Sequence, residues 1–153
     1  MTSNASGFTI SHADHVGFAV SSLDRAEAFW VDVMGATLVS KSQSGGEFLR
    51  EVTGAPNATV RIAMVELAGQ RIELLEYDGP ARPDAPGDPF DPGYGHIAFI
   101  VDDIDALLAR IEPHGWRPQG VPQMAKAGAR EGWRLIYTRG PDGETVEFLQ
   151  PPA

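Results

Sequence analysis

Two histidines and two glutamates of this chain recur at matched places, and their donor atoms are those of a metal site. The stretch DHVGFAV begins at Asp14, and GHIAFIV begins at Gly95. When the chain is aligned with itself at an offset of 81 residues, the two stretches share a histidine, a phenylalanine, a valine and, further on, an aspartate. The aligned pairs are His15 with His96, Phe18 with Phe99, Val20 with Val101, and Asp24 with Asp105. An internal repeat of this kind indicates two copies of one structural unit.

Strand parity assigns the histidines to a face. Side chains alternate between the two faces of a strand, so His15 shares its face with Gly17 and Ala19. The opposite face carries large apolar residues that suit packing on helices. In the second stretch His96 also shares its face with a small residue, Ala98. Each histidine is therefore predicted to lie away from the helices, with space beside it.

Parity places one glutamate of each half in the same way. In RIELLEY, Glu73 faces away from its apolar neighbours, and in ETVEFLQ Glu147 does the same. If the first and last strands of each half lie side by side, four side chains converge on one cavity: His15, Glu73, His96 and Glu147. Two imidazoles and two carboxylates form an N₂O₂ set that suits Zn²⁺, Ni²⁺, Co²⁺, Fe²⁺ or Mn²⁺. An octahedral ion would keep two open positions.

The elements that must position these residues follow the order β-α-β-β-β in each half. Helical spacing runs from Leu23 to Val33 and from Ile104 to Ile111. The strand-like runs are ATLVSKS, ATVRIAMVEL and RIELLEY, then WRPQGV, WRLIYT and ETVEFLQ. WRPQGV contains Pro118, which suits only an edge or a short strand. Hairpin signals occur at 68–69 and 140–143.

We expect a single domain over residues 1–153, with an α+β fold. Module 1 spans about 12–77 and module 2 about 94–150, joined by the connector 78–93, which has five Pro and three Gly. A second loop is predicted over roughly 41–57 and could cover a cavity. Neither module alone would bury much surface, so each depends on the other.

Composition narrows the partners and the metal ligands. The formal net charge is −9 and the pI is about 4.7, which disfavours nucleic acid and anionic membranes and leaves a small molecule as the expected partner. The chain has no Cys, so a metal would need His and carboxylate ligands. The N-terminal residues lack the basic and apolar regions of a signal peptide, so we expect a cytoplasmic protein.

Other polar residues receive weaker predictions. His12, His114 and the glutamates Glu66, Glu76 and Glu144 are interpreted as surface or strand-end groups, although Glu66 reaches the cavity face if the turn at 68–69 is tight. Three residues are candidates for substrate binding: Arg71 and Arg134, either of which could bind a carboxylate, and Tyr137.

The segments DHVGFAV and RIELLEY, followed by GHIAFIV and GPDGETVEFLQ, resemble the vicinal oxygen chelate superfamily, which includes glyoxalase I, bleomycin-resistance proteins and ring-cleavage dioxygenases. The resemblance covers nearly the whole chain. It implies two tandem βαβββ modules that form a cupped mixed β-sheet around a divalent metal ion. By the same analogy the metal ligands are His15, Glu73, His96 and Glu147, and a homodimer is expected.

The four ligand types resemble the glyoxalase I and epimerase side of the superfamily. This implies a metal-dependent lyase or isomerase that removes a proton next to a carbonyl through a metal-bound enediolate, with Glu147 as the first candidate for the base and Glu73 as the second. Methylmalonyl-CoA epimerase typically has Gln where this chain has Glu73. Two alternatives stay open: an Fe(II) extradiol-type dioxygenase, which uses two His and one carboxylate, and an antibiotic-binding resistance protein. The Arg and Asn pattern of glyoxalase I for glutathione is absent.

Overall fold

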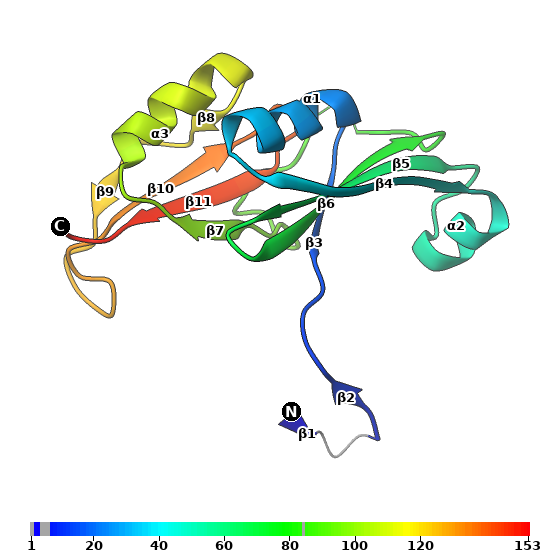
Figure 1. The fold of residues 1–153 in the computed structure, drawn as a ribbon, viewed down its shortest axis with the longest axis horizontal. Coiled ribbons are helices and arrows are strands. Elements are labelled where there is room, and N and C mark those ends of the chain that lie inside the picture. Colours follow the sequence, from blue (N-terminus) through cyan, green and yellow to red (C-terminus); the bar gives the residue numbers. More distant parts are fainter. Residues whose placement is uncertain (1, 4–6, 84) are drawn as a thin grey trace.

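The first half of the computed structural model is a four-stranded mixed sheet covered by one helix (Figure 1). The structure describes residues 2–3, 7–83 and 85–153. After β3 (Val16–Ala19) come α1 (Leu23–Ala28) with a π-helical turn (Phe29–Val33), β4 (Thr37–Gly45), α2 (Gly46–Thr53), β5 (Thr59–Leu67) and β6 (Gln70–Asp78). The strand order is β3-β6-β5-β4, in which β3 and β6 are parallel and the other pairs antiparallel.

The second half repeats this plan. After β7 (Ile97–Ile100) come α3 (Ile104–Ile111) with a 3₁₀ turn (Glu112–His114), β8 (Arg117–Pro118), β9 (Gln123–Met124), β10 (Arg134–Arg139) and β11 (Thr145–Gln150). The order is β7-β11-β10-β8, with β9 also paired to β10, and β7 runs parallel to β11. The two related modules confirm the predicted α+β fold.

An N-terminal arm precedes the first module and projects away from its sheet (Figure 1). It carries β1 (Thr2–Ser3) paired with β2 (Thr9–Ile10). Residues 1 and 4–6 of this segment, and Asp84 of the predicted connector, lie outside the described residues. None of the helices in the described part of the chain has the length and apolarity of a membrane span.

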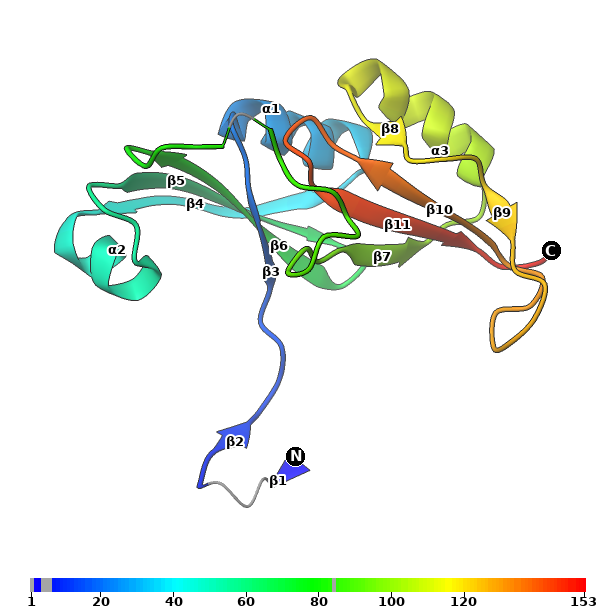
Figure 2. The ribbon, with the colours of Figure 1, turned by 180° about the vertical axis from the view of Figure 1, so that it is seen from behind.

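Helices α1 and α3 lie on the same side of both sheets (Figures 1 and 2). They begin immediately after β3 and β7, where Ser22 and Asp103 act as N-caps that accept hydrogen bonds from the Arg25 and Ala106 amides. The carboxylate of Glu76 accepts a further hydrogen bond from the Leu23 amide at 2.5 Å. Glu76, which the sequence suggested as a surface or strand-end group, is partly buried near the end of β6 and supports the start of α1.

Large side chains between the helices and the sheets join the modules in one core. The rings of Phe29 and Trp116, from different modules, stack with centroids 4.4 Å apart. Trp30 contacts Phe18 of its own module and Phe99 of the other. The apolar faces that parity assigned to β3 and β7 do pack on the helices, as predicted.

The segment predicted as a loop over 41–57 is largely regular. Strand β4 continues to Gly45, and α2 occupies residues 46–53 before ending at Gly54, whose φ is 74°. Leu49 is buried in a small second cluster with Ala58 and Val60. The glycines at 45 and 46 look like loop residues in the sequence, but they mark the corner between the strand and the helix.

Replacement of Trp116 by Ala is expected to destabilise the whole chain by about 3–5 kcal/mol, because it removes a buried ring shared by both modules. Urea unfolding measured by circular dichroism would test this. Trp133, which is partly exposed and lies under Arg130, is a matched control whose loss should cost clearly less. Equal losses for the two variants would contradict a core that depends on the inter-module aromatic contacts.

Candidate metal centre and cavity

The first candidate half-site lies at the start of β3. The parallel register places Gly17 opposite Glu73, so His15, two residues earlier on the same face, meets the carboxylate. The distance from His15 Nε2 to Glu73 Oε2 is 3.3 Å. A Cβ atom at Gly17 would approach Leu75 Cδ1 to 3.3 Å, so glycine leaves room beside the pair.

A third group, Asp14, completes this half-site. Its Oδ2 lies 2.8 Å from His15 Nδ1. This hydrogen bond, with a smaller contribution from the Glu73 charge, raises the pKa of His15 above its ordinary value. The sequence contains Asp14 next to His15, but we did not assign it a role from the sequence.

The second half-site repeats the geometry on β7 and β11. Ala98 lies opposite Glu147, and His96 Nε2 is 3.2 Å from Glu147 Oε2. Tyr137 stands opposite Glu147 on β10, with its hydroxyl 3.2 Å from His96 Nε2 and the two ring centroids 4.7 Å apart. Burial, with the nearby Glu147 charge, raises the pKa of Tyr137, so the phenol keeps its proton and can donate it to a hydrogen bond.

Each pair has a spacing that suits two ligands of one ion. Adjacent ligands at about 2.1 Å from an octahedral metal are about 3.0 Å apart, close to the observed 3.2 and 3.3 Å. Both histidine side chains are about one-third exposed, at 35% and 36%, so an ion could reach them from solvent. Each pair therefore fits half of a four-ligand site.

Within the described part of the chain, the two pairs do not form one cluster of four ligands. Among the residues that the structure describes, no group of three or more His, Cys, Asp or Glu side chains is placed to hold a metal ion. The strands β3 and β7 are each at the edge of their own sheet, and no ladder joins the two sheets. Parity predicts neighbours within a sheet, but it does not fix how two sheet edges are aligned.

An open cavity of about 930 Å³ lies beside the second half-site. Its walls come from β3, the end of β6, the connector, and the turn between β10 and β11. Of the four ligand candidates, His96 lies in its wall, next to Tyr94. The predicted covering segment also contributes, through Thr53 and Ala55.

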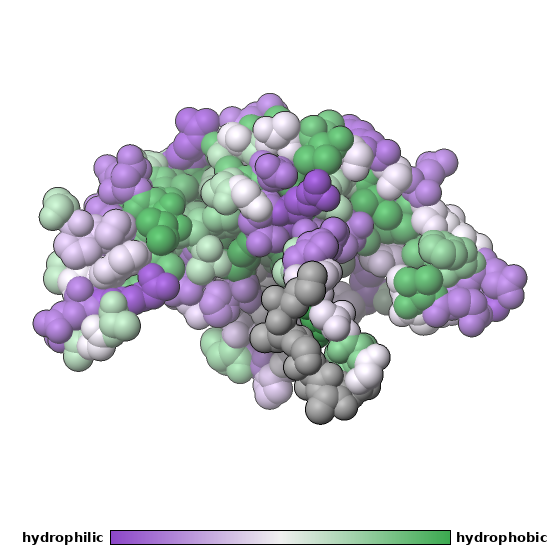
Figure 3. Space-filling model, turned by 60° about the horizontal axis from the view of Figure 1, so that its bottom comes forward, coloured by the Kyte–Doolittle hydropathy of each residue, from purple (hydrophilic) through white to green (hydrophobic). Residues whose placement is uncertain are grey.

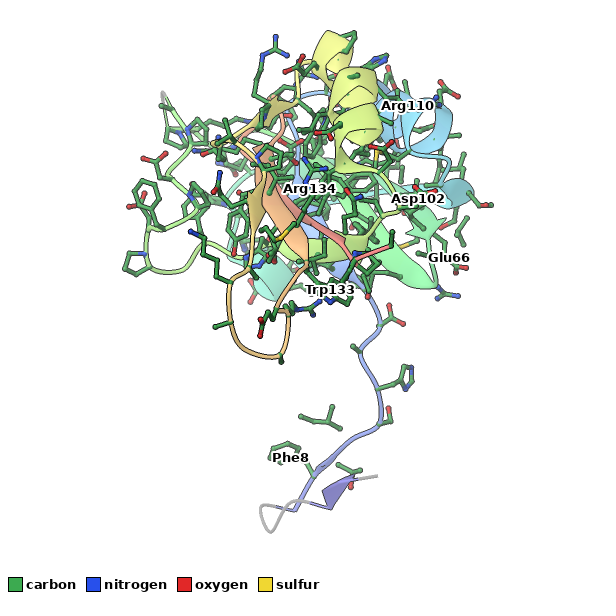
Figure 4. All side chains as sticks on the ribbon, turned by 90° about the vertical axis from the view of Figure 1, so that its left-hand side faces the viewer. Phe8, Glu66, Asp102, Arg110, Trp133 and Arg134 are labelled. Carbon is green, nitrogen blue, oxygen red and sulfur yellow. The ribbon has the colours of Figure 1, made fainter. Side chains whose placement is uncertain are left out.

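Arg134 does not lie on the face of the sheet that carries Tyr137 and Glu147, so it is not placed to bind a substrate there. On β10 it shares the parity of Ile136 and Thr138, which are buried toward the helices. The guanidinium of Arg134, the residue labelled in Figure 4, makes two hydrogen bonds, of 2.9 and 3.0 Å, to the carboxylate of Asp105 at the start of α3. The prediction that Arg134 binds substrate rested on its charge. It did not consider that alternation along the strand turns this side chain to the same face as Ile136 and Thr138.

Arg71 lies on the predicted side of β6, two residues before Glu73. Its Nε is 3.8 Å from Glu66 Oε2, and both side chains are about half exposed. Arg71 thus remains close to the first half-site. His12 and His114 are exposed, as predicted.

Glu144 is a partly buried carboxyl immediately before β11, in agreement with the surface or strand-end position suggested by the sequence. Burial raises its pKa. Its Oε2 accepts a hydrogen bond of 2.9 Å from the Asp142 amide, and a Cβ atom at Gly140 would collide with it. Asp142 in turn accepts hydrogen bonds from the Ser21 amide and from Arg25, which links the two modules. In the sequence, Gly140 could have indicated this contact, because a residue without a Cβ atom lets the Glu144 carboxylate approach the backbone closely.

The chain resembles known proteins along most of its length. Residues 12–148 match the Glyoxalase/Bleomycin resistance protein/Dioxygenase superfamily. The sequence is 33% identical over 145 residues to a 2-epi-5-epi-valiolone epimerase of an Actinomyces species, covering 91% of this chain and 79% of the relative. It is 27% identical over 137 residues to a probable lactoylglutathione lyase of Synechocystis, with 89% and 92% covered. A crystal structure of a glyoxalase family protein from Bacillus cereus superposes with a TM-score of 0.80 at 28% identity, covering 98% of this chain and all of that one.

Replacement of Glu144 by Gln is expected to raise the melting temperature at about pH 7, because the folded state then no longer holds a partly buried carboxylate whose pKa is raised by burial. A carboxyl whose pKa is raised by folding stabilises the protein below its unfolded pKa, and this contribution is lost as the pH rises through the folded pKa. The advantage of Gln should therefore disappear at about pH 3.5, where Glu144 is itself neutral. Circular dichroism melts of both proteins would test this, with the exposed Glu112→Gln as control. An equal shift at both pH values would contradict the prediction.

Proposed function

Because the chain belongs to the Glyoxalase/Bleomycin resistance protein/Dioxygenase superfamily, we propose that it is a divalent-metal-dependent isomerase or lyase that moves a proton next to a carbonyl group. Epimerisation is the first candidate reaction, since a relative with 33% identity is named an epimerase. The observation that carries the proposal is the pair of His–Glu half-sites at equivalent positions of the two modules.

The proposed metal ligands are His15, Glu73, His96 and Glu147. This donor set suits Ni²⁺, Co²⁺, Zn²⁺, Mn²⁺ or Fe²⁺. A bound divalent ion would polarise the substrate carbonyl and lower the barrier to proton removal by several kcal/mol.

Glu147 is the proposed base. Its side chain is 15% exposed and lies between His96 and Tyr137, so the carboxylate is sheltered from most of the solvent. In an epimerase the proton must return to the opposite face of the same carbon. Glu73, on the other module, is the proposed group for that second transfer. Tyr137 and Arg71 are the proposed substrate-binding residues, as a hydrogen-bond donor and as a cation.

We further propose that the complete site forms between two copies of the chain. One copy has two half-sites that are apart, and a twofold axis could bring His15 and Glu73 of one copy against His96 and Glu147 of the partner subunit. The free edges of β3 and β7 are available for such pairing. Exposed apolar side chains also support association: Phe48 and Val52 on α2 are 70% and 68% exposed. Apolar residues gather at the right-hand end of the face seen in Figure 3, where α2 lies.

The function is tested by deuterium exchange from D₂O into 2-oxo compounds and acyl thioesters, with each divalent metal added to chelator-treated protein. We expect metal-dependent exchange, and a loss of about 10²–10⁴-fold in Glu147→Gln because the proposed base is removed. Glu66→Gln, a strand glutamate that is 46% exposed, is the matched control.

Metal content of each protein must be measured alongside this exchange. If wild-type protein binds none of the five metals, both the isomerase and the dioxygenase functions fail, and a binding protein is favoured. O₂ consumption with a catechol and Fe²⁺ alone would favour the dioxygenase.

The shared site is tested with His15→Ala and His96→Ala chains that carry different tags. Each variant alone should lose metal binding and exchange, because both of its sites lack a ligand. A purified heterodimer should regain about half of the wild-type metal and activity, since one of its two sites receives all four ligands. A heterodimer as inactive as the two homodimers would show that each site forms within one chain.

A further inference from the structure

The two half-sites share their His–Glu geometry but differ in what holds each histidine. His15 lies between two carboxylates: Nδ1 is 2.8 Å from Asp14, and Nε2 is 3.3 Å from Glu73. Gly95 occupies the position of Asp14 in the second copy of the repeat. The modules are therefore equivalent in fold but unequal in the chemistry of the histidine.

We infer that Asp14 is a positioning residue that makes the first module the tighter half of the metal site. This inference rests on the proposed function. In the neutral imidazole, a hydrogen bond from Nδ1–H of His15 to the Asp14 carboxylate leaves the lone pair on Nε2, the nitrogen on the side of Glu73 that would bind the ion. A carboxylate behind a ligating histidine fixes its tautomer and ring orientation and increases its basicity as a ligand.

The second half-site lacks this support and has a competing contact. The Tyr137 hydroxyl lies 3.2 Å from His96 Nε2, which is the nitrogen nearest to Glu147. An ion bound there must displace this contact. The result is a division of roles, in which the first module holds the ion and the second keeps Glu147 free to exchange between ligand and base.

Steric constraints do not explain the absence of a carboxylate in the second module. A Cβ atom at Gly95 would have no other atoms within 4 Å, and Gly95 does not have a positive φ. The Gly95→Asp variant can therefore be made without a clash at Cβ. Asp14 itself is 62% exposed, so its replacement by Asn should leave the fold intact.

The test measures affinity for Zn²⁺ and Co²⁺ by competition with a chromophoric chelator, independently of any activity. Asp14→Asn should weaken binding by about 10–100-fold, whereas Asp14→Glu should recover part of the loss. Asp102→Asn, an exposed aspartate that follows β7, controls for the change in net charge and should stay within about twofold. Gly95→Asp should tighten binding.

A second readout uses the metal-free protein. Long-range ¹H–¹⁵N spectra, recorded at an alkaline pH at which the imidazole is neutral, should show His15 with its proton on Nδ1 in the wild type and a mixture of tautomers in Asp14→Asn. Wild-type affinity in Asp14→Asn, or an Nε2–H tautomer in the wild type, would overturn the inference while leaving the proposed function intact. A wild-type protein that binds neither metal would overturn both.

Discussion

The parallel pairing of the first and last strands in each module is the constraint on which the candidate site depends. It places Gly17 beside Glu73 and Ala98 beside Glu147, so each carboxylate meets the histidine two residues earlier on the neighbouring strand. A slip of one residue would turn every side chain of the strand to the opposite face. The glutamate would then enter the aromatic core, where an unpaired charge is strongly unfavourable. The same apolar residues that build the core therefore fix the position of the polar pair.

The helices lie on one side of both sheets and hold the modules together. The opposite sheet faces, which carry the His–Glu pairs, stay accessible. Besides the aromatic contacts, Arg110 on α3 donates hydrogen bonds to the carbonyl groups of Val33 and Asp32, and Asp142 binds the Ser21 amide. These contacts lie at the helices and the strand ends. The strands β3 and β7 each keep one free edge. The contacts between the modules therefore lie on the helix side of the sheets, and the free strand edges can pair with a further partner.

Much of this arrangement could be predicted from the sequence, since it depends on short-range rules. Alternation along a strand identified the faces of His15 and Glu73, and the repeat extended this to the second module. Alternation applied to β10 would also have placed Arg134 on the helix face, but the prediction followed its charge and assigned it to substrate binding. Contacts between elements far apart in the chain could not be derived in this way. The binding of Asp142 to Ser21 and Arg25 of the other module is such a contact. The helix at 46–53 likewise depends on Leu49 joining a cluster with Ala58 and Val60, which alternation along a strand does not predict.

The separation of the half-sites in one chain has an electrostatic consequence. Four ligands in contact would bring Glu73 and Glu147 close together, and two carboxylates that share a site repel unless a cation or a proton intervenes. Apart, each glutamate faces its own histidine, at 3.3 and 3.2 Å, and the repulsion between the two carboxylates does not arise. Assembly of the whole site would therefore be favoured by the divalent ion that it binds. By linkage, an ion that binds only the assembled form stabilises that form. Metal binding and association of two copies should thus be coupled, and the half with Asp14 is the one expected to take up the ion first.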